Sequence, residues 1–282
     1  MKLSLVIEGG GLRGAFAVGA LAELARVLPV PVHQVYATSS GAPNAAYFAA
    51  GQIEDGVRIW QQRTHGAQLV DYRNFVGTRP VMKIDELVSV FRDEIKLDPA
   101  AIERSPIDLH IALTEVDSGQ GALVQATRDN IFDLLAAAMA IPVAYGKVVP
   151  VAGGRYIDGG FRAPVAIREA LAAGADKVIV VLTKPRGHRR KQRRVSEWLQ
   201  CRSYPGLPNT HDAIRSKWRH YNATMDSLDA LEAAGSVALV RPPGELPVGR
   251  LSRSRSRILS AIEIGRQTVR DRAAALAEYL ER

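Results

Sequence analysis

The chain has 282 residues, a length that fits one large domain or two small ones. With 47% hydrophobic and 23% charged residues it has an ordinary globular composition, which excludes wholesale disorder. The longest apolar stretch, Leu134 to Gly146, is short and interrupted by Pro142, so it does not predict a membrane span. Residues Met1 to Glu8 fit no secretory signal and Cys201 has no second cysteine to pair with, so we expect a cytoplasmic protein.

The net charge of +8 is concentrated in the last third of the chain. Residues 1–184 carry 18 Lys and Arg against 19 Asp and Glu, whereas residues 185–282 carry 19 against 10. The basic residues gather in Arg186 to Arg194 and in Arg250 to Arg257. Such a patch suits lipid headgroups or nucleic acid, and equally a solvated surface. Since no zinc spacing, RNA motif or basic zipper occurs, we expect no nucleic acid partner, and a peripheral contact with an anionic membrane surface is the partner hypothesis.

The N-terminal elements follow a strand–loop–helix order. Leu3 to Ile7 is an apolar run that predicts a buried strand, and Gly14 to Leu28 has the apolar spacing of a helix. A second short strand, Gln34 to Ala37, leads through Thr38-Ser39-Ser40-Gly41 into an alanine-rich helix over about Ala42 to Ala50. Repetition of this unit indicates a parallel sheet with helices on both faces.

The rest of the chain continues the alternation of strands and helices. Strands are predicted at Ile107 to Thr114, Gly121 to Thr127, Val148 to Val151, Arg155 to Ile157, Lys177 to Leu182 and Val237 to Val240. Helices are predicted at Ile131 to Ala140, at Ala163 to Ala173 and over most of the C-terminal third. The Arg/Ser tract Arg250 to Arg257 resembles a phosphorylated or RNA-binding segment, but its position before a helical pattern favours a polar helix start.

Three glycines follow the first strand, in the segment Glu8 to Gly14. Between a strand and a helix they let the backbone approach a ligand closely, and the unpaired amides stabilise an anionic oxygen. Gly9, Gly11 and Gly14 also satisfy the dinucleotide pattern G-x-G-x-x-G. That pattern needs an acidic residue about 20 positions later to hold the ribose. No Asp or Glu occurs between Glu23 and Glu54, so a nucleotide-dependent oxidoreductase is disfavoured.

The second strand ends in Ala37-Thr38-Ser39-Ser40-Gly41. A serine in a sharp strand-to-helix turn, with small residues two positions before and after it, has the form of a nucleophile elbow. Glycine two residues after Ser39 favours Ser39 over Ser40, the rival nucleophile. A serine-rich helix N-cap is the alternative that involves no catalysis.

Asp158-Gly159-Gly160 directly follows a predicted strand. By itself this sequence is typical of a turn. A serine nucleophile needs a base, however, and a carboxylate at the end of a neighbouring strand can supply one.

Together, and in this order, the three motifs resemble those of the patatin-like phospholipase family. The resemblance spans most of the chain, about residues 1 to 265, and is carried by Leu3 to Gly14, Val35 to Ala46, Leu134 to Val149, Tyr156 to Gly160 and Lys177 to Gly187. It implies a three-layer α/β/α fold with a central, mostly parallel sheet. One domain over residues 1–282 is expected, with a motif-bearing core of about 1–184 and a basic, mostly helical part of about 185–282.

The resemblance also implies the site. Ser39 would be the nucleophile and Asp158 the base of a Ser–Asp dyad, with no metal and no cofactor. The amides of Gly10 and Gly11, with Leu12 and Ser40 as further candidates, would form the oxyanion hole, and Arg13 would add charge to the loop or brace it. The implied site comprises the glycine loop Gly9, Gly10, Gly11, Leu12, Arg13 and Gly14, and the motif residues Ala37, Gly41, Gly159 and Gly160. Ala37 departs from the glycine usual at that position.

The implied function is a lipid acyl hydrolase that cleaves carboxylic esters of lipids or small molecules through an acyl-enzyme, with apolar helices near the acyl channel. A Ser-His-Asp triad is the competing mechanism, and His188, His211 and His220 follow the acid in the chain. We interpret all six histidines as structural or surface residues. The alternative function is a non-catalytic module that binds a lipid or an anion at the glycine loop. No oligomeric state is predicted.

Overall fold

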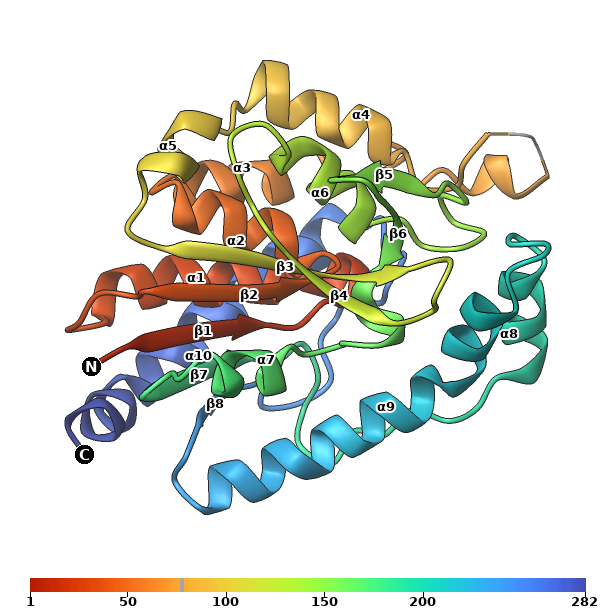
Figure 1. Cartoon of the computed structure of the whole chain (residues 1–282). Helices are drawn as coiled ribbons and strands as arrows, with labels where there is room; N and C mark the ends of the chain where they lie inside the picture. Colours follow the sequence, from red (N-terminus) through yellow and green to blue (C-terminus); the bar gives the residue numbers. More distant parts are fainter. Residues whose placement is uncertain (77–78) are drawn as a thin grey trace.

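The computed structural model describes residues 1–76 and 79–282. One sheet crosses this part of the chain in the order β5-β6-β3-β2-β1-β7-β8, with β4 paired to β3 (Figure 1). Its strands are β1 (Leu3–Ile7), β2 (Gln34–Thr38), β3 (Asp108–Glu115), β4 (Gly121–Gln125), β5 (Val149–Val151), β6 (Gly154–Asp158), β7 (Lys177–Val181) and β8 (Ala238–Val240). Strands β3, β2, β1, β7 and β8 are parallel to their neighbours in that series, whereas β4, β5 and β6 form antiparallel pairs.

Helices cover both faces of the sheet. They are α1 (Gly14–Val27), α2 (Gly41–Ala49), α3 (Ile53–Gln62), α4 (Ile84–Ser89), α5 (Pro99–Arg104), α6 (Ile131–Ala138), α7 (Ile167–Ala172), α8 (Arg194–Cys201), α9 (Pro208–Ala233) and α10 (Arg255–Glu281). Short helical turns are η1 (Gly11–Arg13), η2 (Tyr72–Val76), η3 (Val90–Glu94) and η4 (Gly159–Phe161).

Alternation along the central strand builds two hydrophobic layers. In β1, Leu3, Leu5 and Ile7 belong to the cluster that includes α1, α2 and α10. Val6, on the opposite face, belongs to the cluster that includes α7 and α9. Every residue of β1 is buried, so helices cover the strand on both faces, as is typical of a central parallel strand. The three-layer α/β/α fold predicted from the sequence is thereby confirmed.

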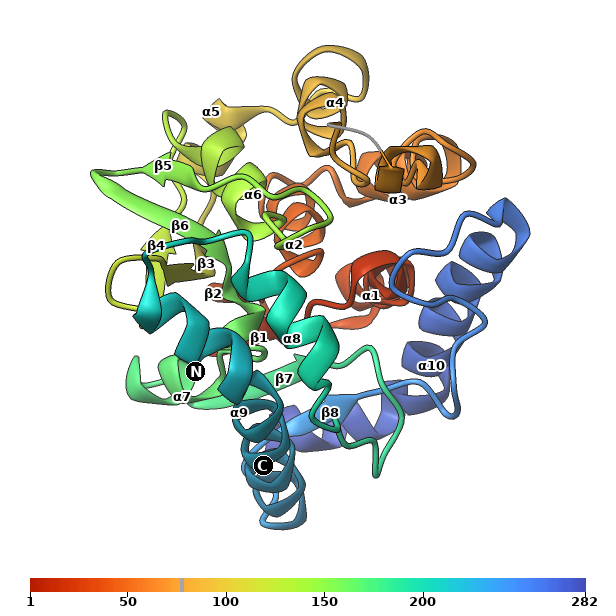
Figure 2. The same cartoon turned by 90° about the vertical axis from the view of Figure 1, so that its right-hand side faces the viewer.

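The C-terminal third completes this architecture. Strand β8 extends the sheet beside β7, and α10 packs along α1. The β1 and β2 arrows point toward the end of the sheet where α8 lies, and Figure 2 faces that end (Figures 1 and 2). Within the described residues, no helix combines the length and apolar character needed to cross a membrane.

The helix expected from Ala163 was predicted to start too early: it begins at Ile167, because Pro164 lies in the loop that precedes it. The Arg/Ser tract contains the polar helix start that was expected. Helix α10 begins at Arg255, and the Ser254 hydroxyl accepts a hydrogen bond from the Arg257 amide and caps the helix.

Candidate active site

Ser39 lies at the sharp turn between β2 and α2. Its φ of 55° is in the left-handed region, which is unusual for a residue with a side chain. Such a conformation costs on the order of 1–3 kcal/mol and persists only where the surrounding packing imposes it. It directs the Ser39 hydroxyl toward Asp158, 119 positions away in sequence, and Ser39 Oγ donates a 2.6 Å hydrogen bond to Asp158 Oδ2. The elbow predicted from the sequence therefore has the strained turn that its motif requires.

Asp158 ends β6 and is held there by its neighbours. Its backbone amide donates to the Ala140 carbonyl, and its carbonyl accepts from the Thr114 hydroxyl. Its carboxylate Oδ1 accepts from the Gly160 amide at 2.7 Å. Burial raises the pKa of Asp158 above its usual value, and the hydrogen bonds from Ser39 and Gly160 oppose the rise. The result is a desolvated, oriented carboxylate in contact with one hydroxyl.

The glycine loop lies directly against the elbow. A Cβ on Gly9 would lie 2.3 Å from Ser39 Cβ and 2.8 Å from the Thr38 carbonyl oxygen, so no side chain fits there. Gly11 has a φ of +59°, and a Cβ there would also meet the Arg250 carbonyl oxygen at 2.5 Å. The loop is thus pressed between the elbow and the segment around Arg250.

Two of the four proposed oxyanion donors are already hydrogen bonded. The Gly10 amide donates to Ser40 Oγ at 3.0 Å, and the Leu12 amide donates to the Arg250 carbonyl at 3.0 Å. The Gly11 and Ser40 amides have no hydrogen-bond acceptor among residues 1–76 and 79–282. The oxyanion hole itself stays a prediction: Gly10 and Leu12 would have to give up these acceptors to serve in it, whereas Gly11 and Ser40 would not. This pair combines a loop amide with the amide that follows the serine.

The base of the glycine loop is braced by a contact that the sequence analysis missed. Glu8 is buried, and its Oε2 accepts from both the amide and the hydroxyl of Thr183 after β7. The same hydroxyl lies 3.0 Å from the Gly9 carbonyl oxygen. Arg13 is buried beside this group, and burial together with the charge of Arg250 lowers its pKa while Glu8 opposes the shift. Which of its two expected roles Arg13 has, adding charge to the loop or bracing it, stays a prediction.

The other motif residues lie within the sheet and at helix starts. Ala37 is buried in β2 between Ile7 and Ile111, so the methyl group is accommodated by the sheet. Gly14 and Gly41 begin α1 and α2, and Gly159 begins η4. Ser40, the rival nucleophile, accepts from Gly10 and makes no contact with Asp158.

No histidine contacts the Ser39–Asp158 pair in the part of the chain that the structure describes. His188 Nδ1 lies 3.7 Å from Glu245 Oε1, and His211 Nε2 lies 2.8 Å from the Tyr204 carbonyl oxygen. His220 Nε2 lies 2.8 Å from Arg162 Nη1. Over the same residues, no three His, Cys, Asp or Glu side chains are grouped so that they could hold a metal ion.

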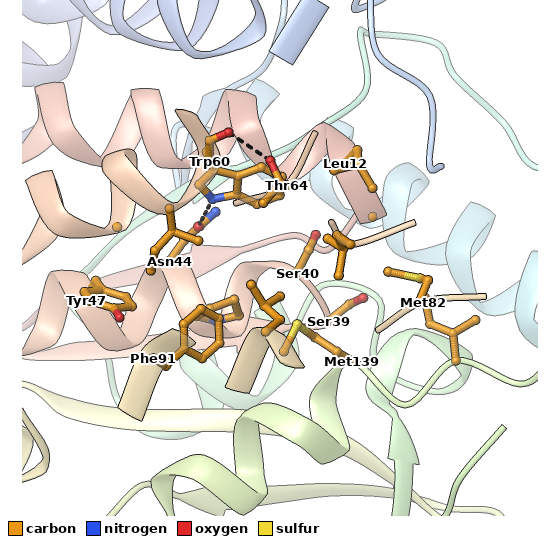
Figure 3. A pocket seen from close by; sticks show the side chains of 17 residues that line it. Leu12, Ser39, Ser40, Asn44, Tyr47, Trp60, Thr64, Met82, Phe91 and Met139 are labelled. Atoms are coloured by element: carbon orange, nitrogen blue, oxygen red, sulfur yellow. Dashed lines mark hydrogen bonds between the residues drawn. The ribbon is translucent and has the colours of Figure 1, made fainter. Parts of the chain in front are cut away.

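An apolar cavity opens on one side of Ser39 (Figure 3). It is narrow, about 30 Å³, and its lining includes Leu12, Pro43, Tyr47, Trp60, Leu69, Met82, Leu87, Phe91, Met139 and Ile141. Trp60 is fixed by a hydrogen bond from its Nε1 to Asn44 Oδ1, and Tyr47 and Phe91 lie at the end away from Ser39 (Figure 3). Flexible Met82 and Met139 line the part nearer Ser39, where a chain entering the cavity would displace them.

A second, polar pocket opens on the other side of Ser39. It has a volume of about 230 Å³ and shares Ser39, Gly11 and Ile141 with the apolar cavity. Asp158 and Gly160 form part of its wall, together with Arg190, Gln200, Lys217, Arg250 and Leu251. The hydroxyl therefore lies at the junction of an apolar and a charged compartment.

Comparisons with known proteins identify the family of the chain. The patatin-like phospholipase family matches residues 5–171, which is more than half of the chain, and the chain belongs to this family. A second match, to a domain of unknown function (DUF6363), covers residues 207–281. These two matches together leave residues 172–206 between them, including α8.

Two individual proteins are similar to the chain. The uncharacterized protein YjjU of Escherichia coli (strain K12) is 28% identical over 197 residues, which are 65% of this chain and 52% of that protein, so the match spans about half of its length. The crystal structure of VipD from Legionella pneumophila aligns with a TM-score of 0.52 and 13% identity, covering 97% of this chain and 67% of the VipD chain. The second similarity is one of fold alone.

Proposed function

We propose that this protein is a serine hydrolase that cleaves the carboxylic esters of lipids with a Ser39–Asp158 dyad. The observation that carries the proposal is the 2.6 Å hydrogen bond from Ser39 Oγ to Asp158 Oδ2 at the junction of the two pockets. Membership of the patatin-like phospholipase family supports the lipid hydrolase class.

In the first half of the reaction, Ser39 Oγ attacks the ester carbonyl carbon while its proton passes to Asp158 Oδ2. The C–O bond to the alcohol then breaks, the proton moves from Asp158 to the leaving alkoxide, and an acyl-serine remains. In the second half, Asp158 takes a proton from water, the resulting hydroxide attacks the acyl carbon, and the proton returns to Ser39 as the acid leaves. A carboxylate whose pKa is raised by burial is a better base than an exposed one.

The negative oxygen that forms at each attack needs fixed donors. The Ser40 amide directly follows the nucleophile, and Gly11 lines both pockets together with Ser39. Neither amide is engaged by another acceptor in the described residues. One such donor is worth about 2.7–4 kcal/mol in other hydrolases. The position of Gly11 depends on Arg250, whose carbonyl holds the adjacent Leu12 amide.

Labelling separates this proposal from the alternative of a non-catalytic binding module. An activated serine should react with a fluorophosphonate probe, and peptide mapping should place the label on Ser39. Ser39→Ala should abolish both labelling and the hydrolysis of p-nitrophenyl esters, whereas the exposed Ser260→Ala should change neither. An unlabelled but folded protein, or a label on Ser40, would contradict the assignment of the nucleophile.

We further propose that α8 places this site on an anionic lipid surface. Its outward face carries Val195, Trp198 and Leu199, which are 75%, 53% and 46% exposed, at the i, i+3, i+4 spacing of one helix face. Four exposed cations flank this face without a carboxylate partner among the described residues: Lys191, Arg193, Arg194 and Arg202. An apolar face rimmed by cations complements an anionic interface. Gln200 of the same helix lines the polar pocket, so docking there would bring lipid to the site.

Sedimentation with vesicles tests this docking. We expect binding to phosphatidylglycerol vesicles that weakens with salt and with Leu199→Ala, and little binding to purely zwitterionic vesicles. Leu171→Ala is the matched control, because Leu171 is 37% exposed on α7, outside the face of α8. Equal loss of binding in both variants, or binding indifferent to anionic lipid, would refute the docking surface.

A further inference from the structure

The polar pocket beside Ser39 is lined by three cationic side chains that the dyad does not use. They are Arg190, in the loop before α8, Lys217 of α9 and Arg250, in the loop before α10. All three lie outside residues 5–171, the part that matches the patatin-like phospholipase family. Asp158 is the only acidic residue in the described lining, so three positive charges face one negative charge.

The two arginines have no carboxylate partner within residues 1–76 and 79–282. The Arg190 guanidinium lies 3.7 Å from the centre of the Tyr221 ring, a contact that fixes its plane but does not neutralise it. Lys217 Nζ donates to the neutral Gln200 Oε1 at 2.6 Å. Two other arginines of the same third do have carboxylate partners: Arg189 Nη2 lies 2.7 Å from Asp226 Oδ1, and Arg241 Nη2 lies 3.1 Å from Asp229 Oδ1. The pocket cations have no such partner in the described residues, so the charge of the lining is left unbalanced.

The three cations also act on one another. Burial and the charge of Arg250 lower the pKa of Arg190 to about 10. The same two causes lower the pKa of Lys217 to about 8. Both groups still carry a proton at neutral pH, so the pocket holds close positive charges at a cost in desolvation and repulsion. The negative charge of an anion bound among them would reduce the repulsion and offset the cost of desolvation.

We propose that Arg190, Lys217 and Arg250 form a subsite for a phosphate group on the ester substrate. The inference rests on the proposed esterase activity and specifies its substrate class: an ester with an apolar acyl chain on one side and a phosphate-bearing alcohol on the other. Ser39 lies between the two pockets, so the acyl chain would occupy the apolar cavity while the phosphate meets the cations. Planar guanidinium groups and an ammonium group suit phosphate oxygens. The excess of two positive charges matches a phosphate monoester dianion.

A pair of substrates that differ only in the phosphate tests the subsite. The enzyme should hydrolyse a 1-acylglycerol 3-phosphate with a kcat/KM at least about 10-fold above that for the 1-acylglycerol with the same chain, since one charge-assisted hydrogen bond is worth about that factor or more. Equal kcat/KM values for the two esters would overturn the proposal.

Charge-removing variants locate the effect. Arg250→Gln keeps the backbone carbonyl that holds the Leu12 amide, so it removes the charge alone. Arg250→Gln should lower the ratio of kcat/KM for the phosphate ester to kcat/KM for the neutral ester about 10-fold, through a higher KM for the phosphate ester. Lys217→Met should have the same effect. The controls Arg257→Gln and Lys96→Met remove the same charges from exposed residues outside the pocket lining and outside α8, and should leave the preference unchanged. Equal losses on both substrates would indicate a structural role and refute the subsite.

Binding to Ser39→Ala distinguishes failure of the subsite from failure of the enzyme. If neither ester is hydrolysed but the phosphate ester binds Ser39→Ala at least about 10-fold more tightly than its neutral counterpart, the proposed function fails and the subsite stands. If the neutral ester is hydrolysed but no phosphate preference appears in binding or turnover, only the subsite fails. The affinity of Ser39→Ala for inorganic phosphate is measured last. If inorganic phosphate binds as tightly as the phosphate ester, the pocket takes free phosphate and the substrate assignment is wrong.

Discussion

Asp158→Asn should inactivate the protein and stabilise its fold at the same time. The substitution keeps the shape of the side chain, and an amide oxygen can still accept from the Gly160 amide, which lies 2.7 Å from Asp158 Oδ1. The amide cannot take the Ser39 proton, however, so kcat/KM for p-nitrophenyl esters should fall by at least about 10²-fold, the lower range of a positioned general base.

The stabilisation follows from the sign of the pKa shift. Burial raises the folded-state pKa of Asp158, so the folded protein holds its proton at pH values where the unfolded chain has lost it. The free energy of unfolding therefore falls as the pH rises from the usual Asp value near 4 through the folded-state pKa, and the full penalty remains at neutral pH. The neutral asparagine side chain removes this penalty. Each pKa unit of difference is worth about 1.4 kcal/mol, which in a chain of this size corresponds to about 2–4 °C in Tm.

Calorimetry at pH 7.5 and at pH 4 measures this effect. The gain in Tm of Asp158→Asn should be larger at the higher pH. Asp129→Asn is the control, because that carboxylate is 91% exposed and its removal should change Tm little at either pH. A variant that is less stable than the wild type at pH 7.5 would show that the ionised Asp158 is a net stabilising group, and the reasoning on burial would be wrong.

Three further outcomes follow from the same contacts. The acid limb of the pH profile of kcat/KM should have its midpoint above the usual Asp pKa near 4. Arg250→Gln should move this midpoint higher, because the charge of Arg250 lowers the pKa of Asp158. A wild-type midpoint at or below 4 would contradict the prediction. Gly9→Ala should reduce turnover by at least about 10²-fold in a folded protein, because its Cβ would lie 2.3 Å from Ser39 Cβ, and circular dichroism would verify the fold. Phe91→Leu should enlarge the far end of the apolar cavity and shift the preferred p-nitrophenyl ester to longer chains while leaving the acetate rate unchanged; an unchanged chain-length profile would place the acyl chain elsewhere.

The sequence alone predicts those features that depend on local pattern. Apolar runs located the strands of the sheet, and the small residues around Ser39 predicted the turn that the structure has at φ 55°. Asp158 could be paired with Ser39 only through the family resemblance, because 119 residues separate them and no local pattern encodes their contact.

The features that the sequence did not predict depend on contacts between distant segments. The availability of the loop amides depends on Ser40 and on the Arg250 carbonyl, so the sequence could not distinguish the engaged amides of Gly10 and Leu12 from the amide of Gly11. Eight of the 17 residues in the described lining of the apolar cavity lie between Gly56 and Phe91, and they carry no motif. They gain a role only when α3 packs beside α2 and α4 beside α6. The basic C-terminal third was evident as a net charge, but composition does not reveal which of its cations lack partners.

Under the proposed function, this distribution of contacts separates the chemistry from the choice of substrate. Ser39, Asp158 and the glycine loop all lie within the part of the chain that the patatin-like family shares, whereas the cations of the polar pocket lie beyond it. The two parts are joined at Arg250, whose carbonyl holds the Leu12 amide while its side chain lines the pocket. Substitutions in the C-terminal third can therefore change the headgroup that is accepted without altering the dyad, but only if the backbone at residue 250 keeps its place. Lengthening or shortening the loop before α10 would disturb both functions together.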